Sequence, residues 1–354
     1  MTSSEARANQ TLRIIDANLN RIGEGLRLLE DLARLLLNDA ALTRQLKEIR
    51  HELTPSDRRL KQQLLQARDS EGDVGVNIEV EQQAKERGLT ATIVANARRV
   101  QESLRVIEEL AKVPGTKLNP EQFKRARFSL YAVERNLISR LLRKDKTGRI
   151  SGLHAIIDTQ FLKGRSHVEV AAQVVEGGAR IIQLRDKAMH KRELLILAKQ
   201  LKSLCVQHNA LFIINDYLDV ALATDADGLH LGQEDLPVTV ARKLLPIDKI
   251  IGCSVASVEQ AIAAESEGAD YIAIGAIYPT LSKEGVEVVG LETVRALKKE
   301  VSLPLVAIGG ITQDNAAEVL SAGADSVAVI SAILEAESPE AATRQMIAQL
   351  ERQN

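Results

Sequence analysis

The fold is decided by residues 180–235, which read RIIQLRDKAMHKRELLILAKQLKSLCVQHNALFIINDYLDVALATDADGLHLGQED. Short apolar runs, such as IIQL (181–184) and LFII (211–214), are separated by longer segments with helical spacing, such as RELLILAKQL (192–201). The short runs lack the alternation of apolar and polar residues that marks a half-exposed strand. This pattern is typical of parallel strands that are buried on both faces and connected by helices.

The same order of a short apolar run and then a helical segment continues from 153 to the end of the chain. Eight runs begin these units: LHAIID, RIIQLRDK, LFIIND, GLHLGQED, KIIGCSV, DYIAIGAIYPT, PLVAIGGI and SVAVISAI. Eight units in about 200 residues predict an α/β fold, a (β/α)8 TIM barrel. A doubly wound open sheet is the alternative, but no GxGxxG motif follows any of the runs.

Polar residues gather where the predicted strands end, which is where a TIM barrel carries its site. They are Gln183, Arg185, Lys187, Asn215, Asp216, Gln233, Asp235, Ser254, Thr280, Ser282 and Lys283. Asp216 and Asp235 end adjacent strands, and two carboxylates are enough to hold a Mg²⁺ ion whose other ligands are water and phosphate. Arg185, Lys187 and Lys283 are cations suited to a diphosphate.

A second anion site is predicted on the opposite side of the same barrel mouth. Gly309-Gly310 and Ile330-Ser331 follow the seventh and eighth strands, where barrels commonly bind phosphate through backbone N–H groups. One anion site with a metal and one without predict two phosphorylated substrates.

The charged residues of this set also have structural interpretations. Asp216 and Asp235 could each cap the helix that follows. Arg185 and Lys187 could be ion-pair partners, including with Asp186. The functional interpretation is favoured because independent structural needs would not place so many polar groups at one end of six strands.

Other residues near these strand ends have structural interpretations as well. Gly309-Gly310 could form only a tight turn. Cys253 lies in an apolar run and is predicted to be a core residue. His154 and His230 are predicted to be hydrogen-bonded barrel residues and not catalysts.

Seven motifs in the barrel region resemble those of the thiamine-phosphate synthase family. They are QLRDK (183–187), IND (214–216), HLGQED (230–235), GCS (252–254), YPTLSK (278–283), AIGGI (307–311) and VISAI (329–333). The resemblance covers about residues 153–340 in the right order. It implies a transferase of thiamine biosynthesis that joins 4-amino-2-methyl-5-hydroxymethylpyrimidine diphosphate to a thiazole phosphate and releases pyrophosphate.

The resemblance also implies a role for each matching residue. The pyrimidine diphosphate would be bound by Gln183, Leu184, Arg185, Asp186, Lys187, Asn215, Ser254 and Lys283. The thiazole phosphate would be held by Thr280, Ser282, Gly310, Ile330 and Ser331, and one Mg²⁺ per chain by Asp216 and Asp235. Asp186 stands where Glu is common in the family and Ser282 where Thr is common, and both substitutions keep the functional group.

The mechanism implied by the family agrees with these residue types. Arg185, Lys187 and Lys283 would be the catalytic residues that, with Mg²⁺, stabilise the departing pyrophosphate. The C–O bond would break before the new bond is well formed, and the thiazole nitrogen would then attack a pyrimidine methylene cation. No Ser, Cys or His nucleophile is required, so catalysis would consist of electrostatic stabilisation and positioning.

Three other functions remain as alternatives. A thiazole tautomerase-like barrel would not need Asp216, Asp235 and Lys283 together. A phosphosugar isomerase could use His230 and Asp216 as acid and base, but it would leave QLRDK and TLSK unexplained. A non-enzymatic scaffold would not bind pyrophosphate in a magnesium-dependent way.

Residues 1–145 are predicted to form a separate all-helical domain that contains an internal repeat. ANLNRIGEGLRLLEDLA (17–33) aligns without gaps with ANARRVQESLRVIEELA (95–111), with nine identities in 17 positions. A basic helix is predicted after each copy, near 41–53 and 120–143. The two helical pairs are expected to form a bundle with pseudo-two-fold symmetry.

The role of this helical domain is left open by its sequence. The repeat is similar to an N-terminal extension fused to some synthases, and related domains have been linked with phosphorylation of hydroxymethylpyrimidine phosphate. No P-loop is present, so dimerisation or packing against the barrel are the alternatives, with Arg21, Glu24, Arg27 and Glu30 forming intrahelical ion pairs. The loop 68–82 joins the copies. The charged stretch 141–152 is predicted to be a linker before the barrel domain at 151–354.

Charge and composition limit the partners of the chain. The first 150 residues hold 28 Lys and Arg against 21 Asp and Glu, a net charge of +7, which leaves 18 against 27, or −9, for the rest. Two solvated surfaces of opposite sign explain this asymmetry without a nucleic-acid or membrane partner. No Trp, two cysteines, no signal sequence and no long apolar stretch predict a cytoplasmic protein. Its partners are then small phosphorylated molecules, and homo-oligomer formation is left open.

Overall fold

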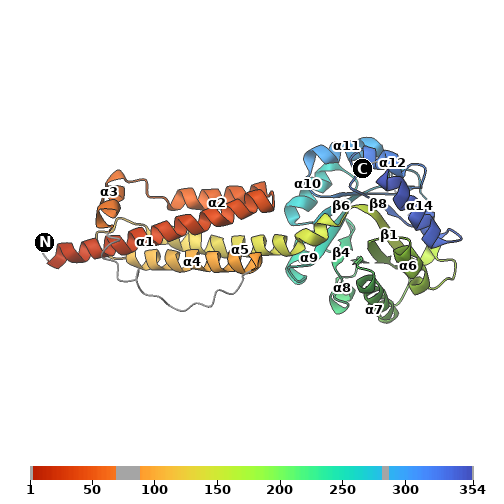
Figure 1. Cartoon of the computed structure of the whole chain (residues 1–354), viewed down its shortest axis with the longest axis horizontal. Helices are drawn as coiled ribbons and strands as arrows, with labels where there is room; N and C mark the ends of the chain where they lie inside the picture. Colours follow the sequence, from red (N-terminus) through yellow and green to blue (C-terminus); the bar gives the residue numbers. More distant parts are fainter. Residues whose placement is uncertain (1–2, 69–87, 281–286, 353–354) are drawn as a thin grey trace. The chain divides into compact units, whose positions relative to one another are not determined.

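The protein is described by a computed structural model that covers residues 3–68, 88–280 and 287–352. The chain divides into two compact units, residues 1–142 and 143–354 (Figure 1). The first unit is helical, and the second contains all eight strands.

The second unit is a closed barrel of eight parallel strands in sequence order (Figure 1). The strands are β1 (Gly152–Asp158), β2 (Ile181–Arg185), β3 (Leu211–Asn215), β4 (Gly228–Leu231), β5 (Ile250–Val255), β6 (Tyr271–Ile274), β7 (Leu305–Ile308) and β8 (Ser326–Val329). Closure is made by β1, which pairs with both β2 and β8. The predicted TIM barrel is therefore confirmed, and the open doubly wound sheet is wrong.

Helices connect successive strands and cover the outside of the barrel. They are α6 (His167–Glu176), α7 (Lys191–Gln207), α8 (Leu218–Ala223), α9 (Val238–Leu244), α10 (Val258–Glu267), α11 (Gly290–Glu300), α12 (Ala316–Ser321), α13 (Ser331–Leu334) and α14 (Pro339–Glu351). The strands are buried between these helices and the barrel interior, and β3, β4, β6 and β8 are buried along their whole length. This burial on both faces explains why their sequences lack alternation.

Tyr271 on β6 lies inside the barrel and is fully buried. Its ring lies against Gly252 on β5, where a Cβ atom would come within 2.0 Å of the tyrosine ring. Glycine at position 252 is therefore a packing requirement, because any side chain there would collide with Tyr271. The ring of Tyr271 in turn forms part of the floor of the cavity described below.

A buried ion cluster in the second unit is centred on Asp270, at the start of β6. Its carboxylate accepts a 2.8 Å hydrogen bond from Arg143 Nε and pairs with Arg242. It also accepts a hydrogen bond of 2.8 Å from the Ile251 backbone N–H. Only 9% of the Asp270 side chain is exposed, so its charge depends on these partners and not on water.

Replacing Asp270 by alanine is expected to destabilise the barrel by about 3 kcal/mol or more, because both arginines would lose their buried partner. The measurement is the denaturant midpoint of the barrel transition. Glu292→Ala is the matched control, because Glu292 pairs with Arg295 in a bridge that is 86% exposed at the glutamate. That variant should change stability by less than about 1 kcal/mol. Equal losses in the two variants would contradict the assigned role of Asp270.

The described part of the first unit is formed by five α-helices, which confirms the predicted helical N-terminal region. They are α1 (Ser3–Asp31), α2 (Ala40–Leu53), α3 (Arg58–Ala67), α4 (Leu89–Leu110) and α5 (Pro120–Gly148). The two copies of the repeat form the C-terminal part of α1 and most of α4, and these helices pack against each other. Gly25 permits close contact, because a Cβ atom there would lie 2.4 Å from Val100 Cγ2.

Equivalent ion pairs connect each copy of the repeat to the basic helix that follows it. Glu30 on α1 pairs with Arg50 on α2 at 3.0 Å, and Glu108 on α4 pairs with Arg127 on α5 at 3.0 Å. The intrahelical pairing expected within the first copy is not what the described residues show, since Glu30 bonds to another helix. The pseudo-symmetry thus extends from the sequence to the packing of the helical pairs.

The structure differs from the prediction for the interdomain linker, and it does not describe most of the loop predicted between the two copies of the repeat. Most of the predicted linker, 141–152, is helical, because α5 continues to Gly148. Its polar residues have partners, such as Lys146, which donates to the Asp248 carbonyl at 2.8 Å. Of the predicted loop 68–82, residues 69–82 lie outside the described residues.

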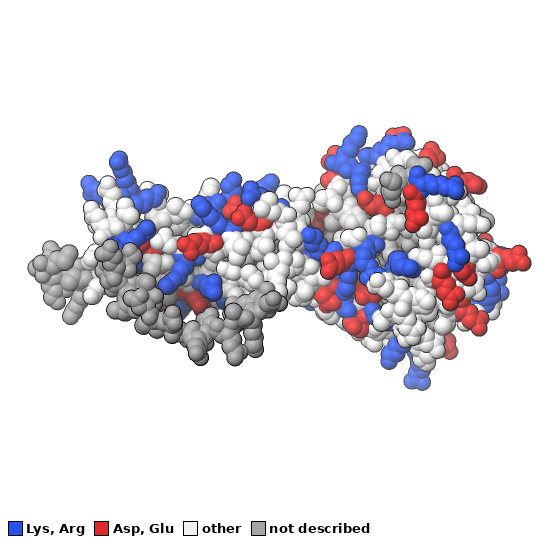
Figure 2. Space-filling view, in the orientation of Figure 1, with Lys and Arg blue, Asp and Glu red and all other residues white. Residues whose placement is uncertain are grey.

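The surface carries charges of both signs on the two units. On the face shown in Figure 2, lysines and arginines are intermixed with aspartates and glutamates over each unit. Among the helices at 3–68, 88–280 and 287–352, none is long and apolar enough to cross a membrane.

Candidate active site

A cavity of about 270 Å³ lies inside the barrel and opens at the carboxyl ends of its strands. Eleven of the residues predicted for the site line it together. They are Gln183, Arg185, Lys187, Asn215, Asp216, Asp235, Ser254, Thr280, Gly310, Ile330 and Ser331. These residues come from seven different strand ends, so barrel closure alone brings them to one place.

The two carboxylates of the site lie side by side. Asp216 follows β3 and Asp235 follows β4, and both side chains line the cavity. Burial and the proximity of Asp235 raise the pKa of Asp216 to about 6, although Lys187 opposes the rise. Two carboxylates held together in a partly buried place form a site for a cation.

Helix capping does not account for either aspartate. Asp216 has a φ of 63°, and the helix α8 that follows begins after Tyr217 without a side-chain cap. Asp235 accepts a 2.7 Å hydrogen bond from the backbone N–H of Gly232, while Pro237 precedes α9. Asp216 is thus held in a left-handed backbone conformation that costs energy for a residue other than glycine.

The basic residues of β2 and its loop approach the site from one side. Arg185 pairs with Asp158 at the end of β1, where the Asp158 side chain is only 2% exposed. Lys187 Nζ lies 3.5 Å from Asp216 Oδ2, and its side chain is 55% exposed. Both cations therefore form ion pairs, as the structural interpretation expected, although neither of them pairs with Asp186. Arg185 is held in place by its pair, whereas Lys187 can move towards a ligand in the cavity.

Asp186 and Leu184, which were predicted to bind substrate, do not line the cavity. Asp186 accepts hydrogen bonds from the backbone N–H groups of Ala188 and Met189, at 2.8 and 2.6 Å, and from the Thr159 hydroxyl. Burial opposes ionisation, but these bonds lower the pKa of Asp186. The carboxylate therefore shapes the loop that carries Lys187. Leu184 is buried in the barrel core, and Ser282 and Lys283 lie outside the described residues.

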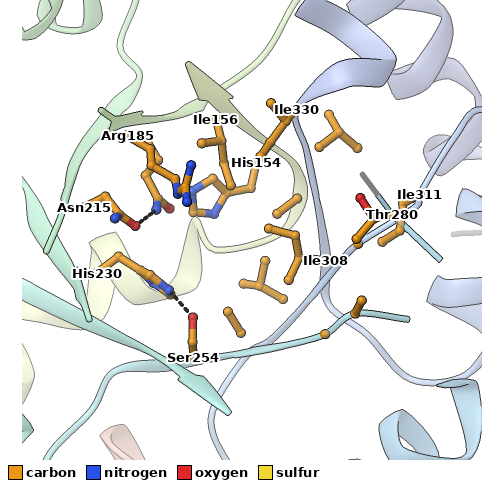
Figure 3. A pocket seen from close by; sticks show the side chains of 18 of the residues that line it. His154, Ile156, Arg185, Asn215, His230, Ser254, Thr280, Ile308, Ile311 and Ile330 are labelled. Carbon is orange, nitrogen blue, oxygen red and sulfur yellow. Dashed lines mark hydrogen bonds between the residues drawn. The ribbon is translucent and has the colours of Figure 1, made fainter. Parts of the chain in front are cut away.

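Three side-chain hydrogen bonds order the polar wall of the cavity, and Figure 3 draws the first two of them. Gln183 Nε2 donates to Asn215 Oδ1 at 2.7 Å. His230 Nε2 lies 2.8 Å from Ser254 Oγ, and its Nδ1 lies 3.0 Å from the Tyr271 hydroxyl. Burial lowers the pKa of His230 to about 4, so its ring is neutral at pH 7. His230 is a hydrogen-bonded barrel residue, as the sequence predicts.

His154 differs from His230, because neither of its ring nitrogens has a hydrogen-bond partner among the described residues. Its ring is 1% exposed and lines the cavity (Figure 3). Burial and the nearby His230 lower the pKa of His154 to about 3. A neutral, unpaired imidazole inside a cavity is available to hydrogen-bond to a ligand. The expectation of a hydrogen-bonded His154 is therefore wrong for the part of the chain that is described.

The remaining wall of the cavity is apolar and was not predicted as part of the site. It is lined by Tyr271, Ala273 and Val306. Three isoleucines that Figure 3 labels, Ile156, Ile308 and Ile311, complete it. These residues are hard to find in the sequence, because an inward-facing position on a buried strand looks the same as an outward-facing one. An apolar slot next to polar groups suits flat aromatic rings that carry phosphate groups.

The last part of the cavity lies beside β7 and β8. Gly309 and Gly310 have φ angles of 100° and 63°, and Ile330 and Ser331 stand at the start of α13. A Cβ atom on Gly310 would lie 2.5 Å from the Pro279 carbonyl oxygen. Glycine is required there by both the backbone angle and the close approach of the preceding loop. Cys253, by contrast, is 4% exposed, and burial raises the pKa of its thiol to about 11, as expected of a core residue.

Known proteins are similar to this chain either over nearly its whole length or over little more than half of it. Residues 153–333 match the family model described as thiamine monophosphate synthase. A thiamine-phosphate synthase of Synechocystis is 40% identical over 343 residues, which are 97% of each chain. The chain belongs to the thiamine-phosphate synthase family. A second relative of that name, from Methanospirillum hungatei, is 49% identical over 54% of this chain and 94% of its own.

A solved structure supports the barrel assignment. The thiamine phosphate pyrophosphorylase of Pyrococcus furiosus is 42% identical, with a TM-score of 0.53, and the match covers 60% of this chain and 98% of that protein. Residues 13–136 match a separate model, that of the ThiD2 family. The expected resemblance is thus confirmed for the barrel, and the helical unit is similar to the model of a second family.

The chemistry of the donor set fits the magnesium ion expected in a thiamine-phosphate synthase. Asp216 and Asp235 offer carboxylate oxygens, and their mutual repulsion would be relieved by a divalent cation. In the described part of the chain, no three His, Cys, Asp or Glu side chains come together as a metal-binding group. A cation held by two carboxylates must complete its shell with water or substrate oxygens, which is usual for Mg²⁺.

If Gly310 holds the thiazole phosphate as predicted, replacing it by alanine should weaken that binding, because the added methyl group would displace the loop at Tyr278-Pro279. We expect the KM for the thiazole phosphate to rise about tenfold or more, as for the loss of a well-placed phosphate contact. Gly290→Ala is the control, because Gly290 also has a positive φ, of 70°, but lies away from the cavity with nothing within 4 Å. A similar rise in KM for both variants would show that backbone strain, and not the cradle, is responsible.

Proposed function

We propose that this chain condenses 4-amino-2-methyl-5-hydroxymethylpyrimidine diphosphate with a thiazole phosphate to form thiamine phosphate and pyrophosphate. The observation that carries this proposal is that one and the same cavity is lined by a carboxylate pair, by two cations and by Gly309-Gly310. The membership of the synthase family supports the same reaction.

The diphosphate would lie at the side of the cavity that contains Asp216, Asp235, Arg185 and Lys187. Magnesium held by Asp216 and Asp235 would supply positive charge that stabilises the leaving pyrophosphate. Arg185 is preorganised by its pair with Asp158 and would bind the phosphate oxygens without a large rearrangement. Lys187 would exchange its contact with Asp216 for one with the diphosphate.

The two rings would share the apolar slot between the diphosphate site and the cradle at Gly310. The aminopyrimidine would meet the amides of Gln183 and Asn215 and the neutral rings of His154 and His230. Uncharged donors and acceptors suit this wall, because a nearby protonated histidine would destabilise a pyrimidine methylene cation. The slot would hold the thiazole nitrogen in position for attack and exclude water from the cation.

The proposal is tested by product analysis of the full chain with Mg²⁺, the pyrimidine diphosphate and the thiazole phosphate. We expect thiamine phosphate and pyrophosphate in equal amounts, and no product when a chelator removes Mg²⁺. Release of pyrophosphate without thiamine phosphate would overturn the condensation and indicate a hydrolase. Isomerisation of the thiazole phosphate alone would favour the tautomerase alternative, and isomerisation of a sugar phosphate the isomerase.

For the helical unit, the match to a second family at 13–136 favours an activity of its own. We propose phosphorylation of hydroxymethylpyrimidine phosphate as the candidate, because it would supply the substrate of the barrel. The full chain would then consume ATP when given the monophosphate, and an unchanged ATP level would leave only the structural roles. The cytoplasmic location and the restriction to small-molecule partners belong to the same proposal.

A further inference from the structure

A second cavity, of about 620 Å³, lies in the helical unit between α1 and α4. Its described lining consists of five residues from each copy of the repeat. They are Asn18, Arg21, Glu24, Gly25 and Leu28 on α1, and Asn96, Arg99, Glu102, Ser103 and Val106 on α4. The barrel chemistry makes no use of this cavity.

Every position in this lining has its repeat equivalent in the lining. Residues 18, 21, 24, 25 and 28 align with 96, 99, 102, 103 and 106 in the gapless alignment of the two copies. Asn, Arg and Glu are identical in the two copies, and the other two positions hold Gly25 opposite Ser103 and Leu28 opposite Val106. The cavity therefore surrounds the pseudo-two-fold axis of the helical pairs, and a ligand in it would meet the same side chains from both sides.

Ion pairs explain other charged residues of the repeat, but not the two arginines and two glutamates that line the cavity. Glu30 and Glu108 connect helices through Arg50 and Arg127, and Arg105 pairs with Glu108 and Glu109. In contrast, the arginines and glutamates of the cavity make no ion pair or hydrogen bond with another residue of the described ranges. Four charged side chains that face one cavity and stabilise no neighbour are available to a ligand.

The two asparagines of the cavity are oriented in the same way. Asn18 Nδ2 donates to the Ile14 carbonyl at 2.9 Å, and Asn96 Nδ2 donates to the Thr92 carbonyl at 2.8 Å. These bonds fix the orientation of both amides. Asn18 is only 6% exposed and lies within a helix, where asparagine is an unfavourable residue. The cavity therefore has two amide side chains of fixed orientation at equivalent positions, next to the longer arginine and glutamate side chains.

We infer that this cavity is a binding site for a phosphate group carried as its magnesium complex. Arg21 and Arg99 would bind phosphoryl oxygens from opposite sides of the pseudo-axis, since guanidinium groups recognise phosphate through two parallel hydrogen bonds. Glu24 and Glu102 would bind the cation directly or through its water ligands. A bare anion is less suitable, because the two carboxylates cancel the charge of the arginines. The site goes beyond the proposed condensation, which needs only the barrel. It deepens the phosphorylation proposed for the helical unit, and ATP consumption tests that reaction separately from the binding tested below.

The inference is tested by footprinting arginines in the full chain with phenylglyoxal, with inorganic pyrophosphate and Mg²⁺ as the probe. Peptide mass spectrometry would report the modification rate of each arginine. We expect Arg21 and Arg99 to be protected at least fivefold, and protection to fall when a chelator replaces Mg²⁺. Arg98 is the internal control, because it is exposed and adjacent to Arg99 but does not line the cavity.

Two variants test whether the arginines act together. Arg99→Gln should abolish the protection of Arg21, whereas Arg98→Gln should leave it unchanged, and unchanged melting temperatures would show that both variants are folded. Equal protection of Arg98 and Arg99, or protection of Arg21 that survives Arg99→Gln, would overturn the inference.

The same experiment separates this site from the barrel. Arg185 should be protected if the barrel binds pyrophosphate as proposed above. Protection of Arg185 without Arg21 and Arg99 would overturn the second site and leave the condensation standing. Protection of Arg21 and Arg99 without Arg185 would support the second site and count against the proposed function of the barrel.

Discussion

Replacing Asp216 by asparagine should lower kcat for the condensation about 100-fold or more, which is typical when one group that stabilises transition-state charge is lost. Asparagine is the chosen substitution because Asp216 has a φ of 63°, a conformation that asparagine tolerates better than alanine. The variant thus removes a charge from the carboxylate pair with little strain. The measurement is steady-state turnover over a range of Mg²⁺ concentrations.

The stability of the same variant separates a functional role from a structural one. Because the pKa of Asp216 is raised to about 6 in the folded state, ionisation of this group opposes folding as the pH rises through that value. Asp216→Asn should therefore melt at the same or a higher temperature than the unaltered chain at pH 8 without Mg²⁺. At pH 4 the variant and the unaltered chain should melt at about the same temperature, because Asp216 is then largely protonated in the folded chain.

Asp219→Asn is the matched control, since Asp219 lies three residues away and pairs with Lys191 on the surface, where its side chain is 59% exposed. It should keep normal turnover. Near-normal turnover by Asp216→Asn, or equal losses in the two variants, would contradict the role of Asp216 in holding the cation.

Replacing Arg185 by alanine should also lower kcat about 100-fold or more, because the leaving pyrophosphate would lose a preorganised cation. Lysine at this position would restore the charge but not the two parallel hydrogen bonds of the guanidinium group. We therefore expect Arg185→Lys to recover only part of the lost activity. The measurement is kcat together with the inhibition constant of the product pyrophosphate.

The buried partner of Arg185 requires a separate control. Asp158 is 2% exposed and would keep its charge without a counter-ion in Arg185→Ala, which destabilises the barrel. The double variant Asp158→Asn with Arg185→Ala removes that unpaired charge and should regain stability without regaining activity. Recovery of turnover in the double variant would show that Arg185 serves the fold and not the leaving group.

The sequence determined the class of the fold and the side of the barrel that carries the site. Eight apolar runs separated by helical segments leave few alternatives to a closed parallel barrel, because both faces of each strand must be buried. The proximity of Asp216 and Asp235 was predictable from the sequence, because neighbouring parallel strands end at the same edge of the barrel. The internal repeat of the helical unit was equally readable, since it is a property of the sequence alone.

The tertiary structure alone decided which partner each polar group takes. Asp158 was not among the candidates, yet it fixes Arg185, because the register of β1 and β2 places those two residues opposite each other. The apolar slot and the unpaired His154 depend on which side of each buried strand faces inward, and buried strands carry no alternation to reveal this. Likewise, the repeat identifies Arg21 and Arg99 as equivalent, but only the packing of α1 against α4 brings them to one cavity. The spacing of apolar residues in the sequence shows which faces of an element are buried. Contacts between residues far apart in the sequence depend on how closely the packed elements approach each other, and the whole fold sets that distance.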